Sequence, residues 1–281
     1  MCKDCGCSGH HHEHGSHHHS HEHGVPHTHV GPDGKSYTHT HDEPLSREVA
    51  IGSAVLASND AIAAANREWF KERKILVFNL ISSPGSGKTS LLVATLKELE
   101  KRHIPAAVIV GDQYGSFDAE RMQSTNAAVT QIETHSSCHL DAARIQKVLK
   151  EAVPENTRIL FIENVGNLVC PVAFDLGENA KIALLSTPEG EEKPLKYPAL
   201  FAAAELVLFT KCDLEKVLEW NFDLSSKNIK QVNPDVQFMR ISSKTKEGFD
   251  SWIDYLLEKL QERGNFKSHS KNGKDVIRKE L

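Results

Sequence analysis

From Ile75 to Arg263 the chain alternates between short apolar runs and longer stretches with helical periodicity. The short runs are apolar on both faces, as in buried strands, and predict strands at Ile75–Ile81, Ala106–Gly111, Ala128–Ile132, Arg158–Glu163, Lys181–Ser186, Leu206–Thr210 and Gln237–Ile241. The periodic stretches predict helices at Lys88–Arg102, Leu140–Glu151, Leu195–Ala204, Leu224–Val232 and Phe249–Arg263. Buried strands that alternate with helices favour an α/β fold, a mostly parallel sheet covered by helices on both faces.

The stretch from Leu45 to Arg73 carries apolar residues mostly at three- and four-residue steps, which predicts a further helix with one apolar stripe. Such a stripe fits a helix packed on its own domain and equally a helix that docks a partner. Both interpretations stay open at this point.

Residues 1–44 differ from the rest of the chain in composition. Thirteen of the seventeen histidines lie between His10 and His41, among Gly, Ser, Pro and Glu. Almost nothing in this segment can enter a core, so we expect it to be disordered without metal. The predicted organisation is therefore a Cys/His-rich metal-binding tail (1–44), a nucleotide-binding domain with an N-terminal helix (45–262) and a polar C-terminal tail (263–281).

Charge and hydropathy exclude several classes of partner. The formal net charge of −5 implies no basic face and argues against nucleic acid. The longest apolar run, Ile75–Ile81, is far shorter than the roughly 20 residues of a membrane-spanning helix, and no secretory signal pattern is present. We expect a cytoplasmic protein with no membrane partner, whose six cysteines are ligands or core residues rather than disulfides.

A small-residue loop follows the first predicted strand of the body and opens a helix at Lys88-Thr89. This context indicates a phosphate-binding P-loop, although Ser82 stands where the strict pattern has Gly. Backbone N–H groups of such a loop surround phosphates, and the helix N-terminus adds positive potential. Lys88 is expected to pair with the β- and γ-phosphates and the Thr89 hydroxyl to ligate Mg²⁺. The predicted phosphate contacts are Gly85, Ser86, Gly87, Lys88, Thr89 and Ser90.

The sequence also predicts which base is bound. Thr210-Lys211-Cys212-Asp213 follows a strand and matches the guanine-reading [NT]KxD element, with Cys212 at its variable place. The Asp213 carboxylate can accept hydrogen bonds from guanine N1–H and N2–H₂, a donor pair that adenine lacks. The Lys211 stem is expected to lie over the base, and Ser242, Ser243 and Lys244 are similar to a second guanine-contact loop. GTP is therefore the predicted nucleotide.

Two further loops lie at carboxyl ends of predicted strands, where open α/β sheets bind ligands. Asp112 ends one strand and Glu163 ends another, and each is a candidate for Mg²⁺ binding or for positioning water. The pattern does not separate these two roles. Gly166 is placed to sense the γ-phosphate through its backbone. The predicted catalytic residues are Lys88, Thr89, Asp112 and Glu163.

Cys138-His139, expected at the start of a helix, and Cys170 provide three soft or borderline metal ligands. Zn²⁺ prefers four ligands in a tetrahedron and Ni²⁺ commonly four in a plane, so a site shared across a two-fold dimer is plausible. Cys170 lies four residues after Gly166, a distance of at most roughly 13–14 Å. A movement of Gly166 on GTP hydrolysis should therefore also move Cys170. The alternative is that Cys170 is a core thiol and Cys138-His139 an ordinary loop pair.

A second candidate metal site lies at the N-terminus, where Cys2, Cys5 and Cys7 place three thiols within six residues. Nickel and zinc both suit such a thiolate set. The histidine clusters that follow suit storage of several ions at intermediate affinity.

The body, roughly residues 45–262, resembles the HypB family of hydrogenase nickel-incorporation GTPases. The resemblance is carried by the motifs at residues 83–89, 111–113, 138–142, 163–171 and 193–198, and by the Cys-x-x-Cys-Gly-Cys start. It implies a dimer formed on GTP or metal binding, nickel or zinc in the domain site, and delivery of nickel to the large-subunit precursor of a [NiFe]-hydrogenase. It also implies a HypA-type nickel/zinc accessory protein as a partner.

Two alternatives remain beside this resemblance. The related urease GTPases carry a Cys-Pro-His metal motif, whereas here Cys138 and His139 are adjacent and Cys170 is added. A nickel or zinc storage protein, in which the tail is the function and the GTPase is minor, is the other alternative. The intact phosphate and guanine loops argue against it.

Overall fold

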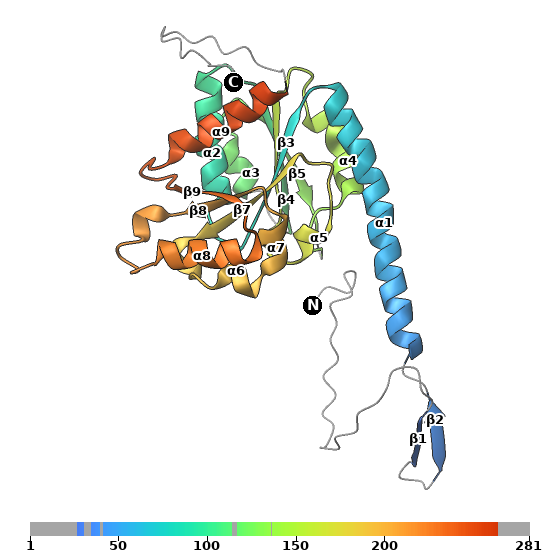
Figure 1. Ribbon diagram of the computed structural model, residues 1–281. Helices are drawn as coiled ribbons and strands as arrows, with labels where there is room; N and C mark the ends of the chain where they lie inside the picture. Colours follow the sequence, from blue (N-terminus) through green and yellow to red (C-terminus); the bar gives the residue numbers. More distant parts are fainter. Residues whose placement is uncertain (1–26, 31–34, 40–41, 114–116, 136, 264–281) are drawn as a thin grey trace, which may run out of the picture.

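The computed structural model describes residues 27–30, 35–39, 42–113, 117–135 and 137–263. Its main body is a sheet of seven strands in the order β5-β4-β6-β3-β7-β8-β9, in which every neighbouring pair is parallel (Figure 1). The strands are β3 (Leu76–Ser82), β4 (Ala106–Asp112), β5 (Ala128–Glu133), β6 (Ile159–Glu163), β7 (Ala180–Ser186), β8 (Leu206–Thr210) and β9 (Gln237–Ile241). The predicted parallel α/β sheet is confirmed.

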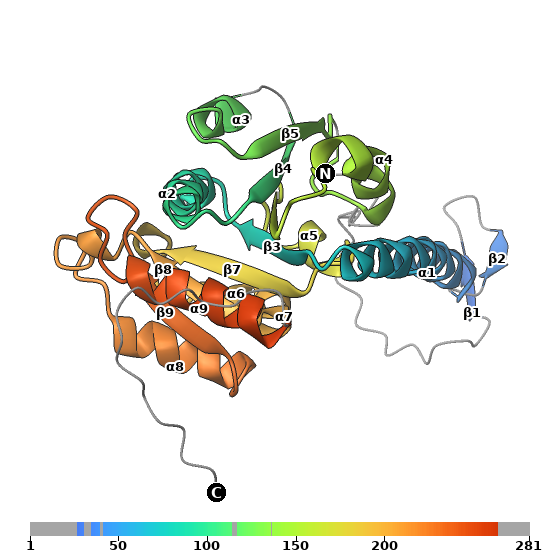
Figure 2. The same cartoon turned by 90° about the horizontal axis from the view of Figure 1, so that it is seen from above.

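Helices cover both faces of this sheet, as Figure 2 shows from above. One core lies between the sheet and α2 (Lys88–Lys101), α3 (Phe117–Met122) and α9 (Phe249–Glu262), and includes the side chains of Phe78, Phe161 and Trp252. The opposite face is covered by α1 (Asp42–Glu72), α4 (Ala142–Ala152), α7 (Pro198–Ala203) and α8 (Phe222–Val232). Strands buried on both faces explain why the sequence pattern there is apolar without alternation.

Two sequence predictions about helices are wrong. The predicted helix Leu195–Ala204 is two short helices, α6 (Lys193–Lys196) and α7, separated at Tyr197. Proline at 198 disfavours helical backbone in the residue before it, and Tyr197 accordingly has φ −128° and ψ 56°. Cys138 and His139 do not begin a helix, because Asp141 caps α4 by accepting from the Arg144 backbone N–H. Both ligands lie instead in the loop between β5 and α4.

The N-terminal part consists of an antiparallel pair, β1 (His27–Val30) and β2 (Ser36–His39), followed by α1. The pair falls within the predicted metal-binding tail, whose first 26 residues lie outside the described part. The C-terminal half of α1 packs on its own domain, where Ala63 and Phe70 are buried. This outcome supports the first interpretation of the apolar stripe, and partner docking by α1 stays a prediction. Within the described residues, none of the helices has the length and apolar character needed to cross a membrane.

Candidate nucleotide site and metal site

The P-loop connects the end of β3 to the first turn of α2. Gly85 and Gly87 have φ of +74° and +96°, in the left-handed region that favours glycine. The Lys88 Nζ donates to the Ser82 hydroxyl at 2.9 Å, so the residue that departs from the strict motif contacts the P-loop lysine. Burial lowers the pKa of Lys88, and the nearby Glu163 carboxylate opposes this shift. The hydrogen bond to Ser82 thus positions the lysine side chain within the loop.

Glu163 lies at the end of β6, directly beside the first residues of α2. The Thr89 hydroxyl donates to Glu163 Oε1 at 2.8 Å. Burial raises the pKa of Glu163 to about 7, although Lys88 and Thr89 both favour its charged form. Among the described residues Glu163 Oε2 is buried and has no hydrogen-bond partner. An unpaired buried carboxylate oxygen next to a threonine hydroxyl is a donor set that fits Mg²⁺.

These groups line one cavity of about 550 Å³ at the carboxyl ends of the strands. Asp112, Gly166 and Lys211 border it as well. Gly166 lies against the P-loop: a Cβ built at this position would be only 3.0 Å from the Pro84 Cα. The structure therefore brings the predicted phosphate, Mg²⁺ and sensor residues to one place.

The same cavity contains side chains to which the sequence analysis assigned no role, Gln113, Asp118 and Arg121. Arg121 donates from Nη2 to the Ser90 hydroxyl at 2.9 Å and pairs with Asp118 at 3.7 Å. Both charged residues lie on α3, a helix of six residues. So short a helix gives no periodic signal, although its position soon after Asp112 marks it as near the site.

A second cavity, of about 630 Å³, adjoins the first through Gly87, Ser90, Arg121 and Lys211. All the predicted guanine contacts line it: Lys211, Asp213, Ser242, Ser243 and Lys244. Lys211 has φ +59°, and its Nζ donates to the Gly85 carbonyl at 2.7 Å. This arrangement joins the predicted base-reading loop directly to the P-loop.

Cys212 does not line this cavity, unlike its neighbours Lys211 and Asp213. Its side chain is buried, and burial raises the pKa of the thiol to about 11. We therefore regard it as a core residue, in agreement with its variable place in the motif.

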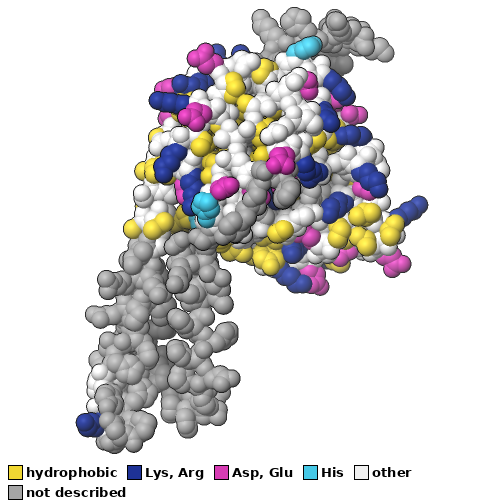
Figure 3. Space-filling view, turned by 180° about the vertical axis from the view of Figure 1, so that it is seen from behind, with side chains coloured by type: hydrophobic (Ala, Val, Ile, Leu, Met, Phe, Trp, Pro, Cys, Tyr) yellow, Lys and Arg dark blue, Asp and Glu magenta, His cyan; other side chains and the backbone are white. Residues whose placement is uncertain are grey.

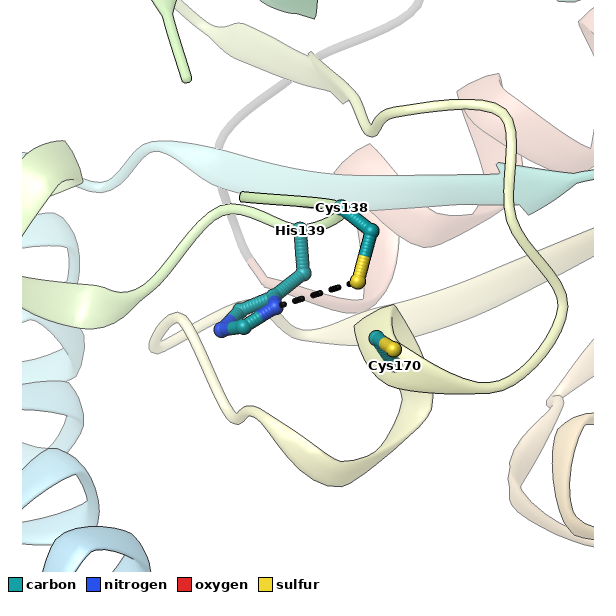
Figure 4. A group of neighbouring side chains, drawn as sticks. All are labelled: Cys138, His139 and Cys170. Carbon is teal, nitrogen blue, oxygen red and sulfur yellow. Dashed lines mark hydrogen bonds between the residues drawn. The ribbon is translucent and has the colours of Figure 1, made fainter. Parts of the chain in front are cut away.

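Cys138, His139 and Cys170 form the candidate metal site (Figure 4). One possible ligand atom from each lies within 4.8 Å of the others. Cys138 and His139 come from the loop before α4, and Cys170 is the first residue of α5 (Cys170–Ala173). Two sulfurs and one imidazole nitrogen suit Zn²⁺ or Ni²⁺, and the described residues supply three of the four ligands that such ions commonly take.

The His139 ring is fixed by its surroundings. It is 5% exposed and stacks on Phe174, with ring centroids 3.9 Å apart and planes 20° from parallel. The Ser137 hydroxyl donates to the His139 carbonyl at 3.1 Å. Phe174, four residues after Cys170, was not selected from the sequence, because an isolated aromatic residue gives no signal of such a contact.

Among the described residues, the candidate ligand His135 does not join this site. The His135 side chain is 70% exposed and lies 3.9 Å from Glu133. Cys2, Cys5 and Cys7 fall outside the described residues, so their metal site stays a prediction.

The chain is similar to known proteins over most of its length. The family model for the CobW/HypB/UreG nucleotide-binding domain matches residues 76–240. The hydrogenase maturation factor HypB of Rhizobium leguminosarum bv. viciae is 45% identical over 224 residues, covering 79% of this chain and 75% of the relative. The crystal structure of HypB from Helicobacter pylori in complex with nickel is 35% identical, with a TM-score of 0.69, and covers 76% of this chain and 99% of that one. HypB from Archaeoglobus fulgidus is 34% identical, with a TM-score of 0.68, over 73% of this chain and 99% of that one.

Proposed function

Since this chain belongs to the HypB family of hydrogenase maturation factors, we propose that it is a GTP-hydrolysing metallochaperone that delivers nickel to a [NiFe]-hydrogenase. The observation that carries the proposal is the cluster of Cys138, His139 and Cys170 beside the nucleotide loops. Cys170 follows the loop that contains Glu163 and Gly166, so hydrolysis can act on the metal ligands through a short covalent connection. Nickel is the cargo in this proposal, and zinc is a second ion that the same ligands suit.

In the proposed hydrolysis Lys88 binds the β- and γ-phosphates, and the Thr89 hydroxyl and Glu163 hold Mg²⁺. Bound Mg²⁺ supplies neutralisation of phosphate charge. Asp112 borders the same cavity and is the candidate for orienting the attacking water. The guanine base is assigned to the cavity lined by Lys211 and Asp213.

A dimer is part of the proposal because the described residues of one chain supply three ligands to this site. Large apolar side chains are exposed on the segment between β8 and α8 and on α8 itself: Val217 (77%), Leu218 (48%) and Leu224 (44%). Figure 3 shows hydrophobic side chains gathered at the lower right of the domain, among charged ones. Such a patch supports association of chains. Next to the metal ligands, the exposed apolar side chain is Val169, which is 53% exposed and directly precedes Cys170.

We further propose a HypA-type nickel/zinc accessory protein and the hydrogenase large-subunit precursor as partners, with residues 1–44 as a nickel store. The cytosolic location stays a prediction. A urease-type nickel GTPase is the alternative within the same family model. Adjacent Cys138 and His139 together with Cys170 favour the hydrogenase assignment.

Nickel titration of the full-length protein tests the proposal. Wild type and Cys138→Ala are each titrated with Ni²⁺ by calorimetry, in GDP and in a non-hydrolysable GTP analogue, with the oligomeric mass measured in parallel. The expected result is a nickel site that Cys138→Ala lacks and whose affinity differs between the two nucleotides. Equal affinity and equal mass in both nucleotides contradict the delivery mechanism.

A second experiment separates delivery from storage. Hydrogenase activity is measured under nickel limitation in cells that carry Lys88→Ala, which leaves the tail and the metal ligands unchanged. Delivery driven by GTP requires the activity to fall to the level of a deletion strain, whereas a storage protein with a minor GTPase keeps it.

A further inference from the structure

The Asn164 side chain connects the nucleotide loop to the metal loop. Asn164 follows Glu163 directly, is 1% exposed, and has its carbonyl Oδ1 between two backbone N–H groups. Val165 N–H donates to it at 3.0 Å, and Leu140 N–H donates to it at 3.3 Å. Val165 precedes the proposed γ-phosphate sensor, and Leu140 follows the metal ligand His139. One amide oxygen therefore holds the backbone beside both sites.

The amide nitrogen of Asn164 begins a second connection through the core. It donates to Asn79 Oδ1 at 3.2 Å, and Asn79 donates in turn to Glu178 Oε1 at 3.2 Å. The other oxygen of Glu178 accepts the Leu176 N–H at 2.7 Å. Leu176 lies two residues after Phe174, the ring that stacks on His139. The network thus reaches His139 from the backbone on one side and from its stacking partner on the other.

Leu140 has little room to move independently of the sheet. A Cβ placed on Gly111 would lie 2.7 Å from the Leu140 Cγ and Cδ1, so this side chain already fills the space over β4. Leu140 is fully buried. A shift of Val165 that changes its hydrogen bond to Asn164 therefore alters the hold on the Leu140 backbone, which directly follows His139. In a buried site such polar connections are strong when complete and costly when broken.

We propose that Asn164 is the positioning residue that makes nickel affinity depend on the bound nucleotide, by holding the Val165 and Leu140 N–H groups with one carbonyl oxygen. The inference rests on the proposed function, since it specifies how the nucleotide site and the metal site are coupled. This hydrogen-bonded connection is separate from the covalent connection that runs along the chain from Gly166 to Cys170. It acts on Cys138 and His139, which lie in the loop between β5 and α4.

The test measures coupling in the full chain from the nucleotide side, because linkage makes the effect of nickel on nucleotide affinity equal to the reverse effect. Fluorescent GDP and a fluorescent non-hydrolysable GTP analogue are titrated with and without saturating Ni²⁺. The coupling factor is the change that nickel causes in the ratio of their two Kd values. The double variant Cys138→Ser/Cys170→Ser gives the coupling factor that nickel bound to the tail produces alone. The factor of each other protein is divided by this value.

Wild type is expected to show a coupling factor of about 5- to 150-fold. Asn164→Leu removes the acceptor and is expected to reduce this factor to less than about 2-fold. Asn164 also borders the nucleotide cavity, so the factor is calculated from the variant's own Kd values without nickel. Asn164→Asp keeps the acceptor and is expected to keep most of the coupling. If Asn164→Leu is recovered unfolded, Asn164→Ala, which removes the same acceptor with less bulk, takes its place.

Asn59→Leu is the matched control. Asn59 is also buried, and its Oδ1 accepts the Ala142 N–H at 2.9 Å, but it contacts the metal side from α1 and no nucleotide loop. Its replacement is expected to leave the coupling factor within about threefold of wild type. The proposed role of Asn164 is refuted if Asn164→Leu keeps the wild-type coupling factor. It is also refuted if Asn59→Leu lowers the coupling factor as much as Asn164→Leu does. A wild-type factor near one instead refutes the nucleotide-dependent delivery proposed above, and the role of Asn164 with it.

Discussion

Lowering the pH through neutrality is expected to weaken Mg²⁺-dependent nucleotide binding through one side chain, Glu163. Its carboxyl group is almost fully buried, and burial raises its pKa to about 7. The Thr89 hydroxyl donates to one of its oxygens, and the other has no partner among the described residues. A cation bound here requires the ionised carboxylate, so each binding event must release the proton that Glu163 carries.

The size of the effect follows from the pKa of about 7. If only the ionised form binds the cation, protonation weakens the apparent affinity by a factor of 1 + 10^(pKa − pH). The factor is about 1.1 at pH 8, about 2 at pH 7 and about 11 at pH 6. Affinity should therefore fall roughly tenfold from pH 8 to pH 6 through Glu163 alone.

The assay is calorimetry of Mg²⁺ and a non-hydrolysable GTP analogue in two buffers of different ionisation enthalpy, which counts the protons released. Phosphate groups of the nucleotide titrate in the same range, so Glu163→Gln is measured beside wild type and the difference is assigned to Glu163. About half a proton should be released at pH 7 by wild type in excess of the variant. Equal proton release and equal pH dependence in the two proteins would falsify the assignment of Glu163 as a Mg²⁺ ligand.

The same shift has a consequence for stability without nucleotide. The folded-state pKa of Glu163 lies above the ordinary value of 4.5, so the folded protein binds this proton more tightly than the unfolded chain. Its contribution is fully present below about pH 4.5 and is lost as the pH rises to about 7. The free energy of unfolding, measured by chemical denaturation between about pH 4.5 and pH 7, should fall more steeply with rising pH in wild type than in Glu163→Gln.

Three further predictions concern turnover, base choice and packing. Wild-type hydrolysis without a partner should be slow, on the order of 10⁻⁴–10⁻² s⁻¹, and Lys88→Ala should abolish it; rapid turnover by the purified wild type would contradict the site assignment. Asp213→Asn should weaken GTP binding by roughly 100-fold, because the new amide presents an N–H donor to a guanine donor, and xanthosine triphosphate, which has an acceptor at that edge, should restore binding. Competition assays check this, and equal competition by ATP and GTP in wild type would refute the guanine assignment. Gly111→Ala should destabilise by about 1–3 kcal/mol, since the new Cβ would lie 2.7 Å from Leu140. Adding Leu140→Ala should then cost less than the sum of the two single changes in denaturant unfolding, and strict additivity would show that the contact relaxes freely.

The sequence was sufficient for features that depend on short segments. Leu206–Thr210 and Gln237–Ile241 have the bounds predicted from the sequence. Leu206–Thr210 is buried along its whole length, so its continuous apolar run identifies it without tertiary information. The P-loop was predicted in spite of Ser82, since a strand, a small-residue loop and a helix beginning at Lys88 follow one another directly. Cys138, His139 and Cys170 were grouped as candidate ligands by residue type, and the resemblance to HypB implied nickel or zinc there, but a core thiol and an ordinary loop pair stayed open as the alternative.

Only the tertiary structure decided which residues distant in sequence are in contact and how far each of them is buried. Cys138 follows β5 and Cys170 follows β6, and these strands are separated by β4 in the sheet, so their approach depends on strand order and loop paths. The raised pKa of Glu163 follows from its burial, and the two contacts of Asn164 join segments 24 residues apart in the sequence. Local patterns determine backbone conformation because their interactions lie within a few residues. Burial and long-range hydrogen bonds are set by the packing of the whole domain, and these carry the electrostatics of the nucleotide site and its connection to the metal ligands.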